Sequence, residues 1–496
     1  MKNIKLFCLL KTLTPAEFRQ LRKAVQSPFF NTDPAAERLY KALAKQYPDF
    51  DGSPQGRQKL FKKVYPKESF RDIRLRRLFS AMTKIVEQFL ILAETERDEQ
   101  SRTRLLTNAY EYRAEETFFK KGIDRQLELV ETLPAKNMNY WLEKVRIYDR
   151  LYASPYLDHN SKHDQTSELL SEAADCFFSF AKLRYGLVLK SKAKIYQTDA
   201  TLRFLPAISD AYRAGFMADN ELFKFYYTAL LLLEQPGDAV FAEYERYFFS
   251  NAAKLKGADR RFLFYIGLNH TIRLVNIGLT PDSYEAMYKW YMEGLAQEII
   301  ILNGRLRVQD FTNIVSVSCV CAEVEETRGF IRNYKKYLPA AQRREGEIYA
   351  LAKVHYSIEE YKDTVLLLNT CSFGRYYLFA AKSLLLRALF ELYRTDDDFG
   401  PLLTDNISAY ENLLRRDKHF TDKRKLLQFN FCRHLRKLFG LIQKRESDNL
   451  IEAVMTTELT KRPNTAAKEW LYKTIQSGKK QKNPVPLNGK TGSSCQ

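Results

Sequence analysis

Glycine and proline are scarce in this sequence, with 19 and 16 residues among 496. No stretch alternates apolar and polar residues for long enough to form an ordinary strand. Folds rich in sheet need such alternation, bounded by frequent turn residues, so they are excluded. Apolar positions instead recur at helical spacing along most of the chain, in a composition that is 45% hydrophobic and 28% charged. This balance is typical of globular proteins, and we predict an all-α fold.

Cysteines are few and scattered. The seven residues are odd in number and include no C-x-x-C pair, which is typical of reduced thiols rather than of a disulfide framework. Cys319 and Cys321 lie in an apolar helical run, where we expect them to pack in the core.

Long apolar runs are also missing: Ala229–Leu233 is far shorter than the roughly 20 residues of a membrane span. The N-terminal run LFCLL is too short for a signal peptide, so we expect a cytoplasmic protein.

Motifs of catalysis and cofactor binding are absent from the sequence as well. It contains no nucleophile elbow, H-E-x-x-H or dinucleotide fingerprint. Gly489–Thr491 matches the end of a phosphate-binding loop, but Pro484 stands where the first glycine would be needed. His159 and His163 are four residues apart between aspartates, yet no third metal ligand can be assigned and a polar turn is the expected structure. His355 has no assignable acid partner. We predict neither an enzyme nor a metal or cofactor site.

Residues 1–95 read as an N-terminal basic helical module. Thr14-Pro15-Ala16-Glu17 has the pattern of a capping box with proline at the first helical position, which predicts a helix to Gln26. Further helices are expected from Pro34, over 58–65 and over 72–94. The last carries a one-sided apolar stripe, composed of Leu75, Leu78, Phe79, Met82, Ile85, Val86 and Phe89. Phe29 and Phe30, in a turn between the first two helices, are expected to point inward.

Three further segments follow. Residues 101–310 are a region of long helices, which we interpret as degenerate repeats, and their continuity with the repeats that follow stays open. Residues 311–475 contain helical-hairpin repeats followed by basic C-terminal helices. Residues 477–496 are polar and rich in Pro, Gly and Lys, and they predict a disordered basic tail.

A self-match with an offset of 34 residues lies within 345–394. At this offset four apolar or aromatic positions coincide: Leu351 with Leu385, Val354 with Ala388, His355 with Leu389, and Tyr356 with Phe390. Ala352 and Thr364 occupy small positions where helices approach closely, and Tyr361 opens a second helix. This unit resembles the tetratricopeptide repeat, an antiparallel helix pair that stacks on its neighbours. Leu386 departs from the pattern, since the second unit should carry a small residue there.

A wider resemblance carries less information about function. The runs NIVSVSCVCAEVEETRGFIRNYKKYLP and AKSLLLRALFELY are similar to a group of uncharacterised bacterial all-helical proteins, as are the N-terminal segments SPFFN and LFKKVYP. No activity is attached to that group. The two resemblances together imply a TPR-like α-solenoid that follows an N-terminal helical module.

The resemblance to tetratricopeptide repeats also implies a binding surface. In such repeats helix A lines the concave face, and the positions that fall there are Tyr349, Lys353, Tyr356, Ser383, Arg387 and Phe390. Lys353 and Arg387 are equivalent in the two units, so two cations should stand side by side, suited to an acidic or C-terminal peptide. We therefore predict a non-catalytic protein–protein interaction scaffold. The alternative interpretation is that the aromatic residues only pack between helices and the cations are only solvated.

The net charge of +19 is concentrated in three places. Residues 54–86 carry ten Lys or Arg against two acids, 415–445 carry eleven against two, and 461–496 carry eight against one. Concentrated basic faces are typical of nucleic-acid binding, which is the alternative function. Its candidate residues are Arg71, Arg74, Arg76 and Arg77 in the first segment and Arg433, Arg436 and Lys437 in the second. Leu75 and Leu78 interrupt the first run at core spacing, and a solvated face explains such runs equally well.

Overall fold

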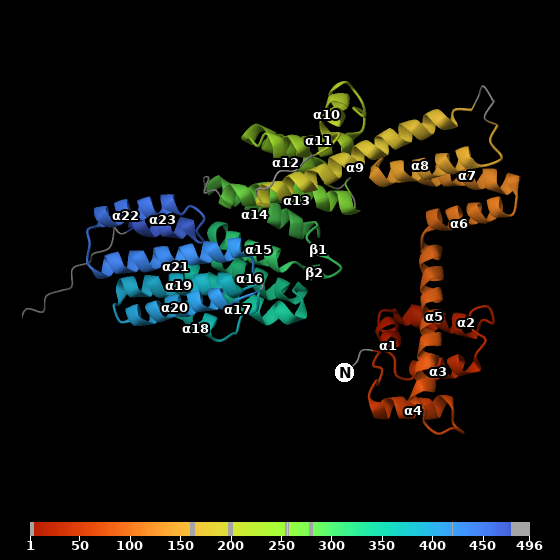
Figure 1. Ribbon diagram of the computed structural model, residues 1–496, viewed down its shortest axis with the longest axis horizontal. Helices are drawn as coiled ribbons and strands as arrows, with labels where there is room; N and C mark the ends of the chain where they lie inside the picture. Colours follow the sequence, from red (N-terminus) through yellow and green to blue (C-terminus); the bar gives the residue numbers. More distant parts are fainter. Residues whose placement is uncertain are drawn as a thin grey trace, which may run out of the picture. The chain divides into compact units, whose positions relative to one another are not determined.

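The computed structural model describes residues 4–158, 164–196, 202–252, 255, 257–276, 281–418 and 420–477 (Figure 1). Within these residues the chain is helical throughout, apart from one short hairpin, so the prediction of an all-α fold is confirmed. The chain divides into two compact units, residues 1–224 and 225–496, which are described in turn. The histidine pair at 159 and 163, and the tail from residue 478 onward, lie outside the described residues.

The first unit consists of an N-terminal module and a series of longer helices. Its helices are α1 (Lys5–Leu10), α2 (Pro15–Gln26), α3 (Pro34–Ala44), α4 (Pro54–Val64), α5 (Asp72–Arg97), α6 (Glu99–Tyr112), α7 (Glu116–Glu131), α8 (Met138–Ala153), α9 (Thr166–Tyr196) and α10 (Leu205–Arg213). Helix α11 (Glu221–Glu234) contains the boundary between the two units.

The N-terminal module follows its sequence signals closely. The Thr14 hydroxyl accepts a hydrogen bond from the backbone N–H of Glu17 at 3.2 Å, and the Glu17 carboxylate accepts one from the backbone N–H of Thr14 at 2.7 Å. These bonds confirm the capping box and start α2 at Pro15. Helix α4 begins earlier than expected because Ser53 caps it, accepting from the N–H of Gly56 at 2.9 Å.

The core of this module lies between α5 and the helices α1 to α4 that contact it. All seven apolar residues of the predicted α5 stripe are buried, as their helical spacing required. Phe30 is partly buried against the same core. The inward orientation expected for Phe29 is wrong, because this side chain is 88% exposed and contacts Phe30 edge-on at 5.0 Å between ring centroids.

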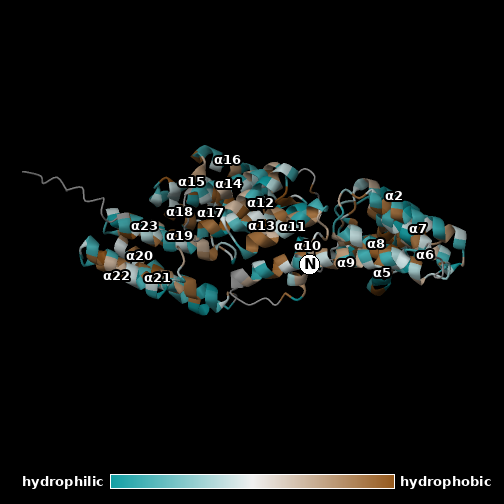
Figure 2. Cartoon of the chain, turned by 90° about the horizontal axis from the view of Figure 1, so that it is seen from above, coloured by the Kyte–Doolittle hydropathy of each residue, from teal (hydrophilic) through white to brown (hydrophobic). Residues whose placement is uncertain are grey.

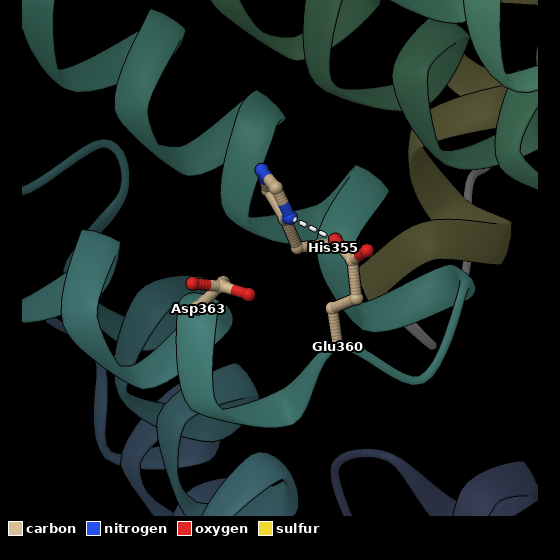
Figure 3. A group of neighbouring side chains, drawn as sticks. All are labelled: His355, Glu360 and Asp363. Carbon is tan, nitrogen blue, oxygen red and sulfur yellow. Dashed lines mark hydrogen bonds and ion pairs between the residues drawn. The ribbon is translucent and has the colours of Figure 1, made fainter.

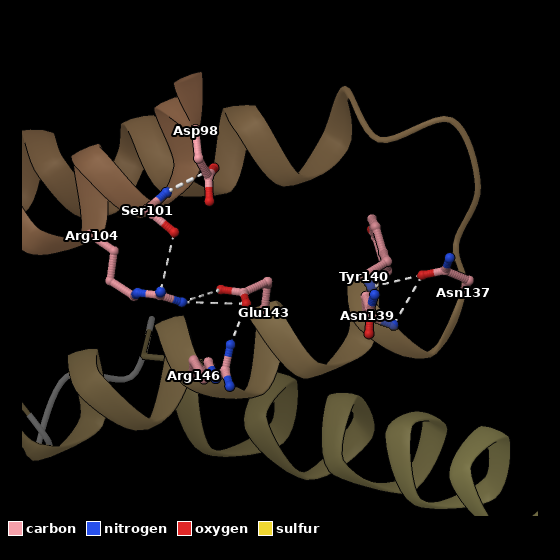
Figure 4. A network of polar contacts seen from close by, with 8 residues as sticks. All are labelled: Asp98, Ser101, Arg104, Asn137, Asn139, Tyr140, Glu143 and Arg146. Atoms are coloured by element: carbon pink, nitrogen blue, oxygen red, sulfur yellow. Dashed lines mark hydrogen bonds and ion pairs between the residues drawn. The ribbon is translucent and has the colours of Figure 1, made fainter. Parts of the chain in front are cut away.

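Polar contacts fix the longer helices of the first unit (Figure 4). Asp98 caps α6 by accepting from the N–H of Ser101 at 3.1 Å, and Asn137 caps α8 by accepting from the N–H of Asn139 at 2.9 Å. Arg104 of α6 donates to Glu143 of α8 at 3.3 Å, which joins two helices that are far apart in sequence. These caps and this bridge have a structural role.

The second unit contains the remaining elements. They are α12 (Asp238–Asn251), α13 (Gly257–Asn276), α14 (Pro281–Ala296), β1 (Ile301–Leu302), β2 (Arg305–Leu306), α15 (Val308–Cys321), α16 (Val324–Tyr334), η1 (Lys335–Tyr337), η2 (Ala340–Gln342), α17 (Arg343–Ser357), α18 (Tyr361–Asn369), α19 (Leu378–Thr395), α20 (Phe399–Arg416), α21 (Asp422–Gln443), α22 (Asp448–Lys461) and α23 (Lys468–Ser477). The hairpin was not expected, although its Asn303-Gly304 turn, with both φ angles positive, is a known hairpin signal.

Helices α13 to α22 pack in order along the second unit. Each helix contacts the next from α17 to α22, and α15, α17, α19 and α21 also contact one another in sequence. In Figure 1, α19, α20 and α21 lie side by side. Hydrophobic and hydrophilic residues alternate around the helices (Figure 2), as expected for elements with one buried face.

The two small positions of the repeat-like unit meet in this core. Ala352 of α17 and Thr364 of α18 are both fully buried, and the Thr364 hydroxyl donates to the Ala352 carbonyl at 3.3 Å. A larger side chain at either position would separate the two helices. Their close approach gives a physical reason for the small residues that the sequence places there.

Candidate functional site

The six residues predicted to hold a partner lie on α17 and α19, which contact each other. Tyr349, Ser383 and Phe390 are buried, with exposed fractions of 5%, 7% and 0%. Side chains this deeply packed offer no surface to a partner, so they cannot act as the direct contacts that the sequence suggested. The other three, Lys353, Tyr356 and Arg387, are half-buried. The predicted surface therefore narrows to two cations and one aromatic ring.

Lys353 extends from α17 toward α15. Its Nζ donates a hydrogen bond to the hydroxyl of Ser316, and the thiol of Cys319 lies near enough to affect its charge. Burial, reinforced by the positive charge of Arg387, lowers the pKa of Lys353 from 10.5 to about 8. The two cations are thus close enough to repel each other.

Arg387 extends from α19 toward the same place. Its Nε donates to the backbone carbonyl of Ser383 at 3.3 Å, and its guanidinium carbon lies 5.2 Å from the centre of the Tyr356 ring. This is the range of a cation–π contact. Among the residues that the structure describes, no acidic side chain forms an ion pair or hydrogen bond with either Lys353 or Arg387. We call these two residues the cation pair.

Helix α23 closes the surface beside the cation pair. The Trp470 ring packs against Phe390 and Phe431, with centroids 5.5 and 6.2 Å apart, and its Nε1 donates to Glu391 at 3.0 Å. Leu471 on the same helix is fully buried. Tyr356 and Trp470 line a hollow of about 950 Å³ between α17, α18, α19 and α23. Its charged lining consists of four acids and three cations: Glu359, Glu360, Asp363, Glu391, Lys362, Arg394 and Lys473. Neither Lys353 nor Arg387 lines this hollow, and the cation pair is connected to it through the Tyr356 ring that Arg387 contacts.

One group in the described part of the chain has the geometry of a metal site. His355, Glu360 and Asp363 each place one ligand atom within 4.8 Å of the others, at the turn from α17 to α18 (Figure 3). His355 Nδ1 lies 2.5 Å from a Glu360 carboxylate oxygen, which supplies the acid partner that the sequence could not assign. Glu360 and Asp363 are exposed. The three side chains could hold a divalent cation, but as they stand they form a hydrogen-bonded His355–Glu360 pair and an exposed aspartate.

The basic segment at 415–445 forms one wall of a groove of about 950 Å³. The groove is bounded by α20, α21, the end of α22 and the turn that follows it, and we call it the basic groove. Its residues are Glu411, Arg415, Leu426, Phe429, Asn430, Arg433, Arg436, Lys437, Lys461, Arg462, Pro463 and Asn464. Six are cations and one is an acid. The three residues predicted from this segment for nucleic acid lie here together.

The N-terminal arginines are arranged differently. Arg74 pairs with Glu68 and stacks on Tyr65 at 4.2 Å, while Arg76 and Arg57 both pair with Asp72. Arg71 and Arg77 form no ion pair with any described residue, and with Arg74 they line a separate hollow of about 970 Å³. Two aspartates line the same hollow, Asp33 and Asp72. Two of the four arginines predicted to contact nucleic acid, Arg74 and Arg76, are thus paired with acids, and the other two are not.

The sequence did not identify several residues of these sites. Ser316 and Cys319 beside Lys353 come from α15, and Arg415, Arg462 and Asn464 of the basic groove come from segments outside α21. The charge runs at 415–445 and 461–496 were the available signal for the groove. Nothing in the sequence linked residue 316 to residue 353, because that contact depends on how α15 packs on α17.

The fold and these sites define an all-helical protein with two concentrations of positive charge in its second unit. Comparisons with models of protein families, with curated proteins and with solved structures found no match for this chain. No helix in the described residues is long and apolar enough to cross a membrane.

Proposed function

We propose that this protein is a non-catalytic interaction scaffold, and that it binds an acidic polypeptide segment at the cation pair. The observation that supports the proposal is the absence of any acidic partner for Lys353 and Arg387 among the described residues, although both side chains are half-buried and repel each other. Removing a charge from water without a partner is costly. A carboxylate from a ligand would compensate both charges at once.

The chemistry of the cation pair suits a carboxylate. The Arg387 guanidinium offers a planar set of donors, and the Lys353 ammonium adds a compact charge beside it. Hydrogen bonds between charged groups of this kind are stronger than those between neutral groups. The ring of Tyr356 contacts the Arg387 guanidinium by a cation–π interaction and helps to hold it in place. In this proposal Tyr349, Ser383 and Phe390 position the cation pair from the core and do not touch the ligand.

The arrangement of the helices supports a TPR-like solenoid as the scaffold. Helices α15, α17 and α19 contact one another in succession, as the first helices of stacked hairpins would. Lys353 and Arg387 come from neighbouring members of this series, at the 34-residue offset found in the sequence. A repeat array would therefore present equivalent side chains in a row along one face.

Binding of a labelled peptide of about six glutamates, with a free C-terminal carboxylate, tests this function by fluorescence anisotropy. Replacing Lys353 with Met should weaken binding by tenfold or more, because losing one member of a buried charge contact costs about 2–5 kcal/mol. Lys444→Met is the matched control, since Lys444 is an exposed lysine at the end of α21 that has no ion pair to any described residue and lines none of the hollows described above. Equal affinity for wild type and Lys353→Met would remove the cation pair as the binding site.

A further inference from the structure

The basic groove contains two classes of cation. Four are held by carboxylates: Glu411 contacts Arg436 at 3.0 Å and Arg415 at 3.7 Å, and Glu458 contacts Lys437 at 3.1 Å and Arg462 at 2.6 Å. Each carboxylate is shared by two cations, so the positive charge remains in excess. The Lys437 ammonium and its cationic neighbours lower the pKa of Glu458, which therefore stays ionised at neutral pH.

The remaining two cations, Arg433 and Lys461, form no ion pair with any described residue. Arg433 is exposed and lies one helical turn after Phe429 on α21, so the guanidinium and the ring occupy the same side of the helix. Aromatic rings and arginine planes are the surfaces on which unpaired bases stack. The groove thus offers positive charge for a phosphate backbone and an aromatic ring on which a base can stack.

The two walls of the groove are fixed to each other. The Asn430 amide of α21 donates to the Asn464 carbonyl at 2.8 Å, and the N–H of Ala466 donates to the Leu427 carbonyl at 3.0 Å. These bonds hold the turn after α22 against α21 and keep Lys461 and Arg462 opposite Arg433. A ligand would therefore meet a preformed groove and would not have to order it.

The shape of the groove discriminates among polyanions. Its cations line a hollow between two helices and a turn, whereas the major groove of a duplex is typically read by a helix that protrudes into it. Acidic peptides bind on arginine clusters, and other peptides bind in sheet edges, apolar grooves or aromatic-lined grooves. The ring of Phe429 beside Arg433 is the feature that suits this groove to a stacked base rather than to an acidic peptide. This groove offers no sheet edge, and its apolar lining is limited to Leu426, Phe429 and Pro463. An extended chain of phosphates carrying unpaired bases fits best.

We propose that the basic groove binds single-stranded nucleic acid, with phosphates on the unpaired Arg433 and Lys461 and on the four carboxylate-paired cations, and with a base on the ring of Phe429. This site is separate from the cation pair and does not depend on the function proposed above. It would give the protein a second kind of partner, because one unit would then present both a carboxylate site and a phosphate site.

Anisotropy with a labelled oligouridylate of about twelve nucleotides, at about 50 to 200 mM salt, tests the groove in the full-length protein. The logarithm of the binding constant should fall with the logarithm of salt by about 0.7 for each phosphate contact. The double variant Arg433→Ala/Lys461→Ala removes the two unpaired cations and should reduce that slope by about 1.4. Arg71→Ala/Arg77→Ala, which removes the unpaired cations of the N-terminal module, should leave the slope unchanged.

Binding of a duplex and of a polyglutamate separates this proposal from its alternatives. A duplex of the same length should bind at least about tenfold more weakly, and a polyglutamate of the same length should bind weakly and without competing. An unchanged slope in Arg433→Ala/Lys461→Ala would overturn the proposal, as would a loss of binding in Arg71→Ala/Arg77→Ala alone. Equal affinity for polyglutamate would instead assign the groove to an acidic polypeptide.

Discussion

The cation pair and the basic groove lie in the same unit and differ in how their charges are compensated. Lys353 and Arg387 are two half-buried cations whose only described polar contacts are to neutral groups. The basic groove has six cations, mostly exposed, and four of them share the carboxylates of Glu411 and Glu458. Two half-buried charges without an acidic partner can thus have a larger energetic effect than six solvated ones, because water and counterions screen the exposed charges.

The largest expected effect is a gain of stability on removing Lys353. Replacing a buried, uncompensated cation with an apolar residue of similar length should stabilise the protein by about 1–4 kcal/mol at pH 7, measured by denaturant unfolding. The gain should depend on pH with a definite sign. The pKa of Lys353 is lowered in the folded state to about 8, so its cost is fully present below pH 8 and disappears as pH rises toward 10.5.

The advantage of Lys353→Met over wild type should therefore shrink between those pH values. Lys362→Met, at an exposed position, should change stability by less than about 0.5 kcal/mol at any pH. A Lys353→Met variant less stable than wild type at pH 7 would mean that the ammonium is compensated, and the contrast with the groove would fail.

A smaller change in stability is expected on removing a cation of the basic groove that is paired with a carboxylate. Arg436→Ala removes contacts to Glu411 at 3.0 and 3.2 Å, and should cost about 0.2–1 kcal/mol at low salt because the arginine side chain is 46% exposed to solvent. The cost should decrease when salt is raised to about 1 M, where screening acts within about 3 Å. A loss that is insensitive to salt would indicate that the groove is held by buried interactions like those around Lys353.

The smallest effect is expected from Arg433, the unpaired cation of the same helix. Arg433→Ala should change the free energy of unfolding by less than about 0.5 kcal/mol, while it weakens oligonucleotide binding. The two measurements separate a ligand contact from a structural one. Destabilisation comparable to that of Arg436→Ala would show that Arg433 has a structural partner.

Local signals in the sequence predicted much of the fold. The capping box at Thr14 and Glu17 and the apolar stripe of α5 depend on residues within a few turns, and both are confirmed. The prediction that Phe29 points inward was wrong because the exposure of this side chain depends on which surface its turn faces, and no local sequence pattern specifies that. The TPR-like arrangement of the repeats stays a prediction.

The candidate sites were less predictable because they form between helices. The 34-residue offset identified Lys353 and Arg387 as equivalent, but not the burial of Phe390 under Trp470, a residue 80 positions further along the chain. The charge runs identified α21 as basic, but acids from α20 and α22 decide which of its cations stay unpaired. Charge counts along a sequence omit this distinction, since pairing is determined by tertiary contacts.

The affinity of the hexaglutamate peptide as a function of pH tests the central claim most directly. Because binding requires the protonated ammonium of Lys353, the affinity of wild type should fall by up to tenfold per pH unit above about 8. Lys353→Arg keeps its charge over this range, and its affinity should stay constant from pH 7 to about 9.5. A wild-type affinity that is equally constant over that range would contradict a carboxylate site at the cation pair.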